Sequence, residues 1–190
     1  TINGTIINNK NFNSRYVLAN LNSKLIGFYY DNVFNIGAEF TTAVAIHNLD
    51  LIPIKNISLV NQQPFIEKAN LMQSLNKELK KISDSFVQLL QSKFNIEKNS
   101  KKIQNWHTLE FGNFLKEFEK ARKKSSKENE TEYSELSLNE ENKWMQYFNE
   151  QKQKAQELKT KIEKTDKEID QIVYELYGLT KEEIEIVEEA

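Results

Sequence analysis

Apolar residues recur at alternating steps of four and three positions in two long stretches of the chain, the spacing of helices that bury one face against a partner helix. The seam of the second stretch comprises Trp144, Phe148, Gln151, Ala155, Leu158, Ile162, Thr165, Ile169, Ile172 and Leu176. Pro64 opens the first stretch, whose seam comprises Met72, Leu75, Leu79, Ile82, Phe86 and Leu89. We therefore predict two long helices, over residues 63–91 and 139–177.

The two seams can bury each other if the helices pair antiparallel within one chain, because residues 92–138 supply a connection. Homodimerisation through the same seams is the competing interpretation, and an ordinary helical bundle would share most of the hairpin's geometry. We expect the intramolecular hairpin and a monomer. The longer helix should end at Gly178, which suits the left-handed C′ position, and Thr180 with Glu183 should form a capping box that begins a short last helix.

Residues 1–61 lack this long periodicity and predict a small mixed α/β module. Candidate strands are residues 2–7, 40–46 and 51–54, although the β-branched run at 40–46 also fits a short helix. Ser14 is placed to cap a helix from Arg15 to about Tyr30.

The expected fold class is thus α+β and predominantly α, with the small module followed by a long antiparallel helical hairpin, a coiled-coil-like spacer. The expected divisions are residues 1–61, 62–91, 92–138 and 139–190. The third of these should contain a basic helical insert, capped by Thr108, and an acidic loop at residues 125–135.

Composition narrows the functional classes. The 190 residues carry a formal net charge of −2 and contain no cysteine, so disulfides and thiolate metal sites are excluded. No apolar run approaches the roughly 18 residues of a membrane helix, and we expect no membrane partner. The chain begins at Thr1, without Met and in what looks like the middle of an element, so we expect a fragment of a larger protein.

Catalytic chemistry is not indicated by the motifs. The two histidines, His47 and His107, have no second ligand at a metal-binding spacing. There is no Gly-rich phosphate loop, and the Glu-x-Lys pairs fall inside the predicted long helices. We predict no active site, no metal site and no cofactor site in this chain.

Two groups of residues are candidates for nucleic-acid contacts. The first is a turn before a predicted helix, where Asn and Arg can read base edges and Ser and Lys can hold phosphates; it comprises Lys10, Asn11, Asn13, Ser14 and Arg15. The second is a basic run suited to phosphate neutralisation, comprising Lys93, Lys98, Lys101, Lys102, Arg122, Lys123, Lys124 and Lys127. The structural alternatives are an ordinary helix cap for the first group and a solvated surface for the second.

Several segments resemble a known protein family. Residues 161–184, which read Lys-Ile-Glu-Lys-Thr-Asp-Lys-Glu-Ile-Asp-Gln-Ile-Val-Tyr-Glu-Leu-Tyr-Gly-Leu-Thr-Lys-Glu-Glu-Ile, resemble the C-terminal end of bacterial type II restriction–modification enzymes with an adenine-specific DNA methyltransferase. Residues 16–30 look like the Leu-Asn-Ser helix of their target-recognition domain. Residues 51–54 and 62–66 resemble the entry into their spacer helix, and residues 100–106 with Phe111 and Phe114 fit the insert between the helices.

The resemblance implies a non-catalytic region that recognises a DNA sequence and acts as a spacer, in a cytoplasmic protein. Its implied partners are double-stranded DNA and the catalytic methyltransferase domain of the same chain. S-adenosylmethionine, and Mg²⁺ if a nuclease is fused, would belong to the missing part. The methylation motif Asn-Pro-Pro-Tyr is absent, since the only prolines are Pro53 and Pro64. A coiled-coil oligomerisation or interaction module without DNA binding is the alternative function.

Overall fold

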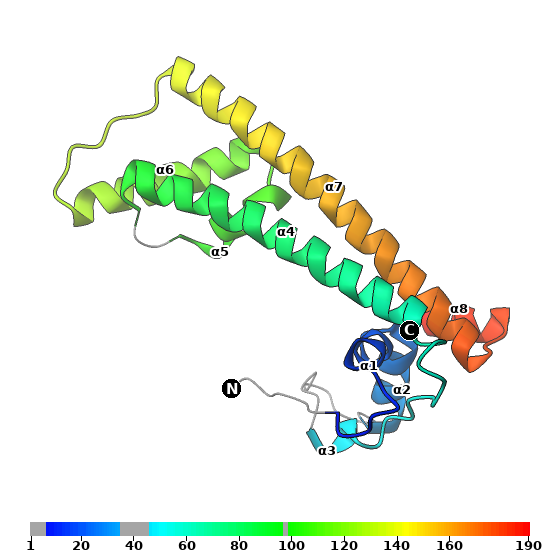
Figure 1. Cartoon of the computed structure of the whole chain (residues 1–190). Helices are drawn as coiled ribbons and strands as arrows, with labels where there is room; N and C mark the ends of the chain where they lie inside the picture. Colours follow the sequence, from blue (N-terminus) through cyan, green and yellow to red (C-terminus); the bar gives the residue numbers. More distant parts are fainter. Residues whose placement is uncertain (1–6, 35–45, 97–98) are drawn as a thin grey trace. The chain divides into compact units, whose positions relative to one another are not determined.

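A computed structural model describes residues 7–34, 46–96 and 99–190 of the chain (Figure 1). The helices of these residues, in chain order, are α1 (Ser14–Leu21), α2 (Lys24–Phe34), α3 (Ile46–Leu49), α4 (Gln63–Phe94), α5 (Lys101–Gln104), the 3-10 helix η1 (Trp106–Thr108), α6 (Phe111–Glu128), α7 (Leu138–Tyr177) and α8 (Lys181–Glu189). The chain divides into two compact units: unit 1 is Thr1–Gln73 with Glu163–Ala190, and unit 2 is Ser74–Ile162.

All regular elements within the described ranges are helical, so the predominantly α character is confirmed. The strand predicted at residues 51–54 is wrong, because these residues form turns that close on themselves. Leu51 N–H donates to Asn48 O and Ile52 N–H donates to Leu49 O, which leaves no extended run to pair with another strand. Ile52 is instead buried against α2. The other predicted strands, 2–7 and 40–46, lie almost wholly outside the described residues.

The single helix predicted from Arg15 to Tyr30 is two helices, and its cap is Asn13, whose side chain accepts from Arg15 N–H at 2.8 Å. Ser14 is the first helical residue. The break follows α1, where the Ser23 hydroxyl donates to Asn20 O at 2.7 Å and competes with helix continuation. Lys24 then begins α2, and its N–H donates to the carboxylate of Asp170 at 2.8 Å.

The long helices α4 and α7 pack together antiparallel in each unit (Figure 1). In unit 1, Lys68 of α4 pairs with Glu168 of α7 at 2.6 Å. In unit 2, the Phe86 and Phe148 rings lie 6.1 Å apart and those of Phe94 and Trp144 lie 5.7 Å apart. Every predicted seam residue is buried or half-buried, which confirms the intramolecular pairing of the seams.

An aromatic cluster forms the core of unit 2. The Phe86 ring stacks on Trp106 at a centroid distance of 3.9 Å, and Trp106 Nε1 donates to the backbone oxygen of Ser83. From α6, Phe114 and Phe118 are fully buried in the same cluster. This helix begins after Glu110, not at a Thr108 cap, and extends to Glu128 through the first part of the predicted loop. Its apolar face consists of Phe111, Phe114, Leu115 and Phe118.

The C-terminal end of α7 follows the prediction. Gly178 has a φ of +75°, and the N–H of Leu179 donates to Tyr174 O at 3.1 Å, which is the Schellman pattern. Thr180 and Glu183 make the predicted capping box at the start of α8. None of the helices in the described part of the chain has both the length and the apolar character of a membrane span.

Candidate nucleic-acid interface

The first group of predicted contacts lies in unit 1, in the turn of residues 10–15 that leads into α1. Lys10 and Asn11 are exposed, and Ser14 is exposed as the first residue of the helix. Asn13 uses its side-chain oxygen to cap the helix. The turn therefore exposes the cation of Lys10, the amide of Asn11 and the hydroxyl of Ser14 at the helix start. These groups can contact phosphates and base edges.

A buried glutamine holds this turn in place. Gln62 is fully buried, and its Nε2 donates to Asn11 O at 2.6 Å and to Ile57 O at 3.0 Å. Its Oε1 accepts from the N–H of Asn13 at 2.8 Å. One amide thus satisfies two backbone groups of the turn and one of Ile57, and it fixes the turn to the residue that precedes α4.

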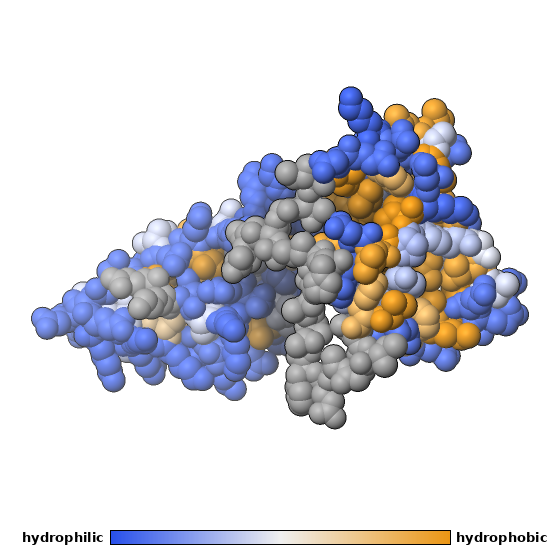
Figure 2. Space-filling view, turned by 90° about the horizontal axis from the view of Figure 1, so that it is seen from below, coloured by the Kyte–Doolittle hydropathy of each residue, from blue (hydrophilic) through white to orange (hydrophobic). Residues whose placement is uncertain are grey.

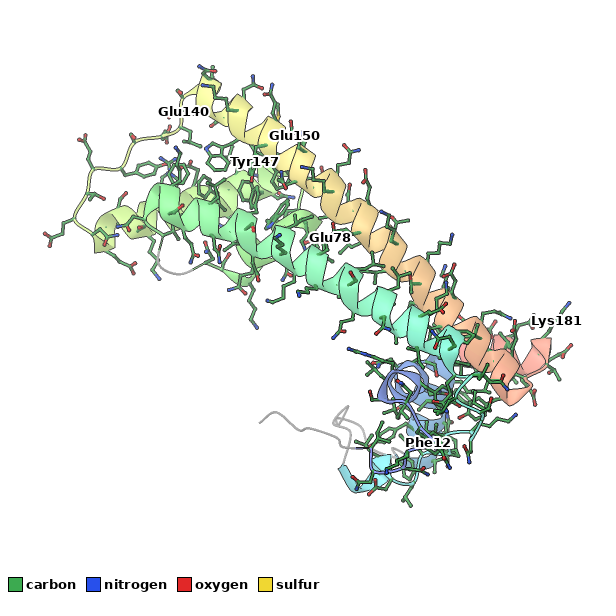
Figure 3. The ribbon with its side chains drawn as sticks, in the orientation of Figure 1. Phe12, Glu78, Glu140, Tyr147, Glu150 and Lys181 are labelled. Carbon is green, nitrogen blue, oxygen red and sulfur yellow. The ribbon has the colours of Figure 1, made fainter. Side chains whose placement is uncertain are left out.

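Aromatic packing supports the turn from behind. The Phe12 ring, labelled in Figure 3, stacks on Tyr16 at 6.3 Å, and Tyr16 meets the edge of Phe65 at 5.1 Å. Tyr16 is fully buried, and its hydroxyl donates to Lys55 O at 2.6 Å. Burial raises the pKa of Tyr16 to about 12, so the phenol remains a hydrogen-bond donor across the physiological range.

Arg15 is already oriented by a neighbour. Its Nη2 donates to Oε1 of Gln73 at 2.6 Å. A guanidinium has five N–H donors, so this bond positions the group and leaves others to face a ligand. Arg15 thus has the stronger geometric case for a directional contact, and Lys10 for a phosphate contact.

The second group lies in unit 2. Lys101 and Lys102 are exposed on α5, and Lys123 and Lys124 are exposed on α6. Lys124 lies 3.7 Å from Glu128 of the same helix. These lysines place positive charges on the surface, and the structure brings Lys102 and Lys123 to one groove.

Arg122 differs from its neighbours because its guanidinium is used inside the fold. It pairs with Glu119 at 2.6 Å, lies 4.7 Å from the centre of the Phe94 ring and donates to Ser134 O at 3.0 Å. Only 11% of its side chain is exposed. It therefore stabilises the start of the 129–137 segment and contributes little to an external surface.

Lys116 and Lys120 of α6, which the sequence analysis did not include, line the same groove as Lys102 and Lys123. A groove of about 630 Å³ between α5 and α6 is lined by Lys102, Leu109, Asn113, Leu115, Lys116, Glu117, Glu119, Lys120 and Lys123. Their helical spacing could have identified them, because Lys116, Lys120, Lys123 and Lys127 follow one another at steps of four, three and four. That spacing places them on one face of a helix.

A second groove of unit 2, of about 550 Å³, lies between α4 and α7. It is lined by Leu89, Lys93, Phe94, Glu140, Lys143, Trp144 and Tyr147, of which Figure 3 labels Glu140 and Tyr147. Its aromatic residues also belong to the unit 2 core or pack against it. The side chain of Glu140 accepts from Ser137 and caps α7, so this groove lies beside a helix start held by its own residues.

Apolar residues are also exposed on unit 1. Figure 2 shows hydrophobic residues gathered over the surface of this unit. The large apolar residues exposed on unit 1 include Leu51 at 61%, Leu59 at 57% and Val60 at 81% exposure. Over unit 2 the same view shows mostly hydrophilic residues. A large contiguous apolar patch on a protein surface is typical of an interaction site.

The histidines have no catalytic setting in the described residues. His107 is half-buried beside Trp106, and burial, with a smaller contribution from Lys159, lowers the pKa of its imidazole. His47 lies in α3, and its side chain falls outside the description. Among the residues that the structure describes, no group of three or more His, Asp or Glu side chains is arranged to hold a metal ion.

Two family models match the chain. Residues 58–173 match the model described as Domain of unknown function (DUF8810), and residues 1–54 match the model described as TaqI-like C-terminal specificity domain. The second match confirms the resemblance to the specificity region of restriction–modification enzymes. Such a domain has a DNA target-recognition role and is non-catalytic. No curated protein and no solved structure shows a significant similarity to the chain.

Proposed function

We propose that this chain, which belongs to the family described as Domain of unknown function (DUF8810), is the DNA-recognition and spacer region of a restriction–modification enzyme. Residues 1–54 supply sequence recognition, and the paired helices α4 and α7 supply the spacer. The methyl transfer, with S-adenosylmethionine, and any DNA cleavage, with Mg²⁺, belong to other parts of the parent enzyme. That parent would carry an adenine-specific DNA methyltransferase.

The observation that carries this proposal is the specificity-domain match over residues 1–54. The geometry of unit 1 supports it, because the turn of residues 10–15 is exposed on its outer side and held by Gln62 on its inner side. Base reading needs side chains held in a fixed register, since each hydrogen bond to a base edge depends on position. A buried amide that bonds two backbone groups of the turn and lies directly before α4 meets this requirement.

The alternative, a coiled-coil oligomerisation module, has less support. The seams of α4 and α7 cover each other within one chain in both units, so the apolar surface that would drive dimerisation is already occupied. A monomer of 22.3 kDa is therefore expected in analytical ultracentrifugation. A dimer that persists on dilution would favour the alternative.

Selection from a library of random duplex DNA tests the recognition role. The full chain is incubated with the library, and bound duplexes are sequenced. We expect the wild type to enrich a short motif and the double variant Lys10→Ala/Arg15→Ala to lose that enrichment. Lys181→Ala, which removes an exposed lysine at the start of α8, is the matched control and should keep it. A wild-type chain that enriches no motif would contradict the proposal.

A further inference from the structure

We propose that the groove between α5 and α6 in unit 2 is a second DNA contact, which binds the phosphate backbone of a duplex without reading its sequence. The inference rests on the proposed function, because that function brings DNA to the chain. It extends DNA contact beyond the specificity match into the region matched by the family of unknown function. Recognition and affinity would then reside in different units.

The geometry of α6 carries the inference. Lys116, Lys120, Lys123 and Lys127 form a row on one face of the helix, called here the lysine row, and all four are exposed. The opposite face is apolar and buried in the unit 2 core. At 1.5 Å per residue the row extends about 16 Å. Lys102 of α5 reaches the same groove from its other wall.

The acidic residues of the groove do not cancel this charge. Glu119 is paired with Arg122 at 2.6 Å and accepts a hydrogen bond from the Tyr133 hydroxyl. Glu117 lies 3.1 Å from Lys120 and 3.4 Å from Lys102. Hydrogen bonds from these lysines, the larger effect coming from Lys120, lower the pKa of the Glu117 carboxyl. The four lining lysines and two glutamates, together with Arg122, therefore leave a net charge of +3.

An extended polyanion fits this surface better than a small anion does. The lysines are spread along a line and are largely solvent-facing, with 73% of the Lys120 side chain and 68% of the Lys102 side chain exposed. A small anion would contact one or two of them. Duplex DNA carries one charge per roughly 1.7 Å of axis, so about ten phosphate charges lie along a row of this length.

The salt dependence of DNA binding tests the inference. A labelled duplex of random sequence is titrated with the full chain, and fluorescence anisotropy gives the binding constant over about 50 to 200 mM KCl. The variant Lys116→Gln/Lys120→Gln/Lys123→Gln should lower the slope of log K against log[KCl] by about three, roughly one for each phosphate contact removed. Circular dichroism checks that its helix content is unchanged.

The matched control removes the same number of exposed lysines from other helices of unit 2. Lys77→Gln/Lys81→Gln/Lys154→Gln should leave the slope within about one of the wild type. An unchanged slope in the lysine-row variant overturns the inference, and so does a wild-type chain that binds no duplex. Preferential binding of poly-glutamate, in competition with the duplex, would assign the groove to an acidic protein instead.

The two proposals fail in different ways. If the selection experiment enriches no motif but the lysine-row variant lowers the slope, the recognition role fails and the phosphate contact stands. If a motif is enriched and the slope is unchanged, the phosphate contact fails alone. When both proposals hold, the lysine-row variant binds all duplexes more weakly and still enriches the wild-type motif.

Discussion

Replacing Gln62 with leucine tests whether a buried amide fixes the candidate recognition turn. Leucine has a similar size but cannot hydrogen-bond, so Gln62→Leu removes one bond to Asn11, one to Asn13 and one to Ile57. The Gln62 side chain is fully buried. The turn should lose both its fixed position and part of the stability of unit 1.

The magnitude follows from the three hydrogen bonds. Each intramolecular bond contributes about 1 kcal/mol net, so the variant should lower the free energy of unfolding by about 3 kcal/mol. Backbone groups of the exposed Asn11 can regain water, which sets about 2 kcal/mol as the lower end. With a urea dependence of about 2 kcal/mol per molar, the midpoint falls by about 1 to 1.5 M.

Two optical probes separate the units. Both tryptophans, Trp106 and Trp144, lie in unit 2, so tryptophan fluorescence follows the unfolding of that unit, whereas far-ultraviolet circular dichroism follows the helices of both. Urea titration of Gln62→Leu should shift the dichroism transition more than the fluorescence transition. In the duplex selection the same variant should lose motif enrichment.

The control is the neighbouring glutamine. Gln63 is exposed and its side chain donates to Glu67 at 3.1 Å on the same helix surface, so Gln63→Leu should change the free energy of unfolding by less than about 0.5 kcal/mol. If Gln62→Leu is equally mild, the three bonds do not hold the turn and the reasoning is refuted. A large loss of stability with unchanged motif enrichment would refute the link between this turn and recognition.

Three further outcomes are expected. Phe86 is fully buried and stacks on Trp106, so Phe86→Ala should lower the free energy of unfolding of unit 2 by about 3–5 kcal/mol. Urea titration followed by tryptophan fluorescence measures this loss. Met145→Ala, at an exposed position, is the control and should change the free energy of unfolding little. Gly178→Ala should lower the free energy of unfolding by about 1 kcal/mol, because the φ of this residue is +75°. Gly112→Ala, inside α6, should leave the free energy of unfolding unchanged or raise it by up to about 1 kcal/mol. Thermal melts compare the two variants. Burial raises the pKa of Asp170, so the folded state binds the proton of this carboxyl more tightly than the unfolded state does. The contribution of Asp170 to the free energy of unfolding therefore falls as the pH rises from the ordinary pKa of aspartate through the raised pKa. Asp170→Asn keeps an acceptor for Lys24 N–H and should gain stability relative to the wild type over that window; a difference that does not change with pH would contradict this.

Features that close within a few residues were predictable from the sequence. The Gly178 end of α7 and the Thr180 capping box depend on bonds between residues at most five positions apart, and both occur as predicted. The seams were predictable because a helix repeats its faces at a fixed period. The break after α1 was not, because it involves Asp170, which lies 146 positions from Lys24.

Tertiary partners also explain the other errors. The run at residues 51–54 has strand-like residues, but a strand needs a neighbour for its backbone, and Ile52 instead packs on α2 with its backbone closed in turns. Arg122 belongs to a basic run in sequence, yet the rings of Phe94 and Tyr133 and the carboxylate of Glu119 draw it into the fold. Charge counting alone cannot separate such an arginine from its exposed neighbours.

The two candidate contacts differ in how much they depend on distant residues, and this difference should appear in their tolerance of substitution. The lysine row needs only an exposed helix face, so each lysine acts almost independently and a single Lys→Gln change should lower the salt slope by about one. The turn of residues 10–15 depends on Gln62, which is 49 positions from Asn13. One substitution at Gln62 should therefore remove recognition altogether, while affinity for random duplex, supplied by unit 2, remains. Equal losses of affinity and selectivity in Gln62→Leu would mean that one surface performs both tasks.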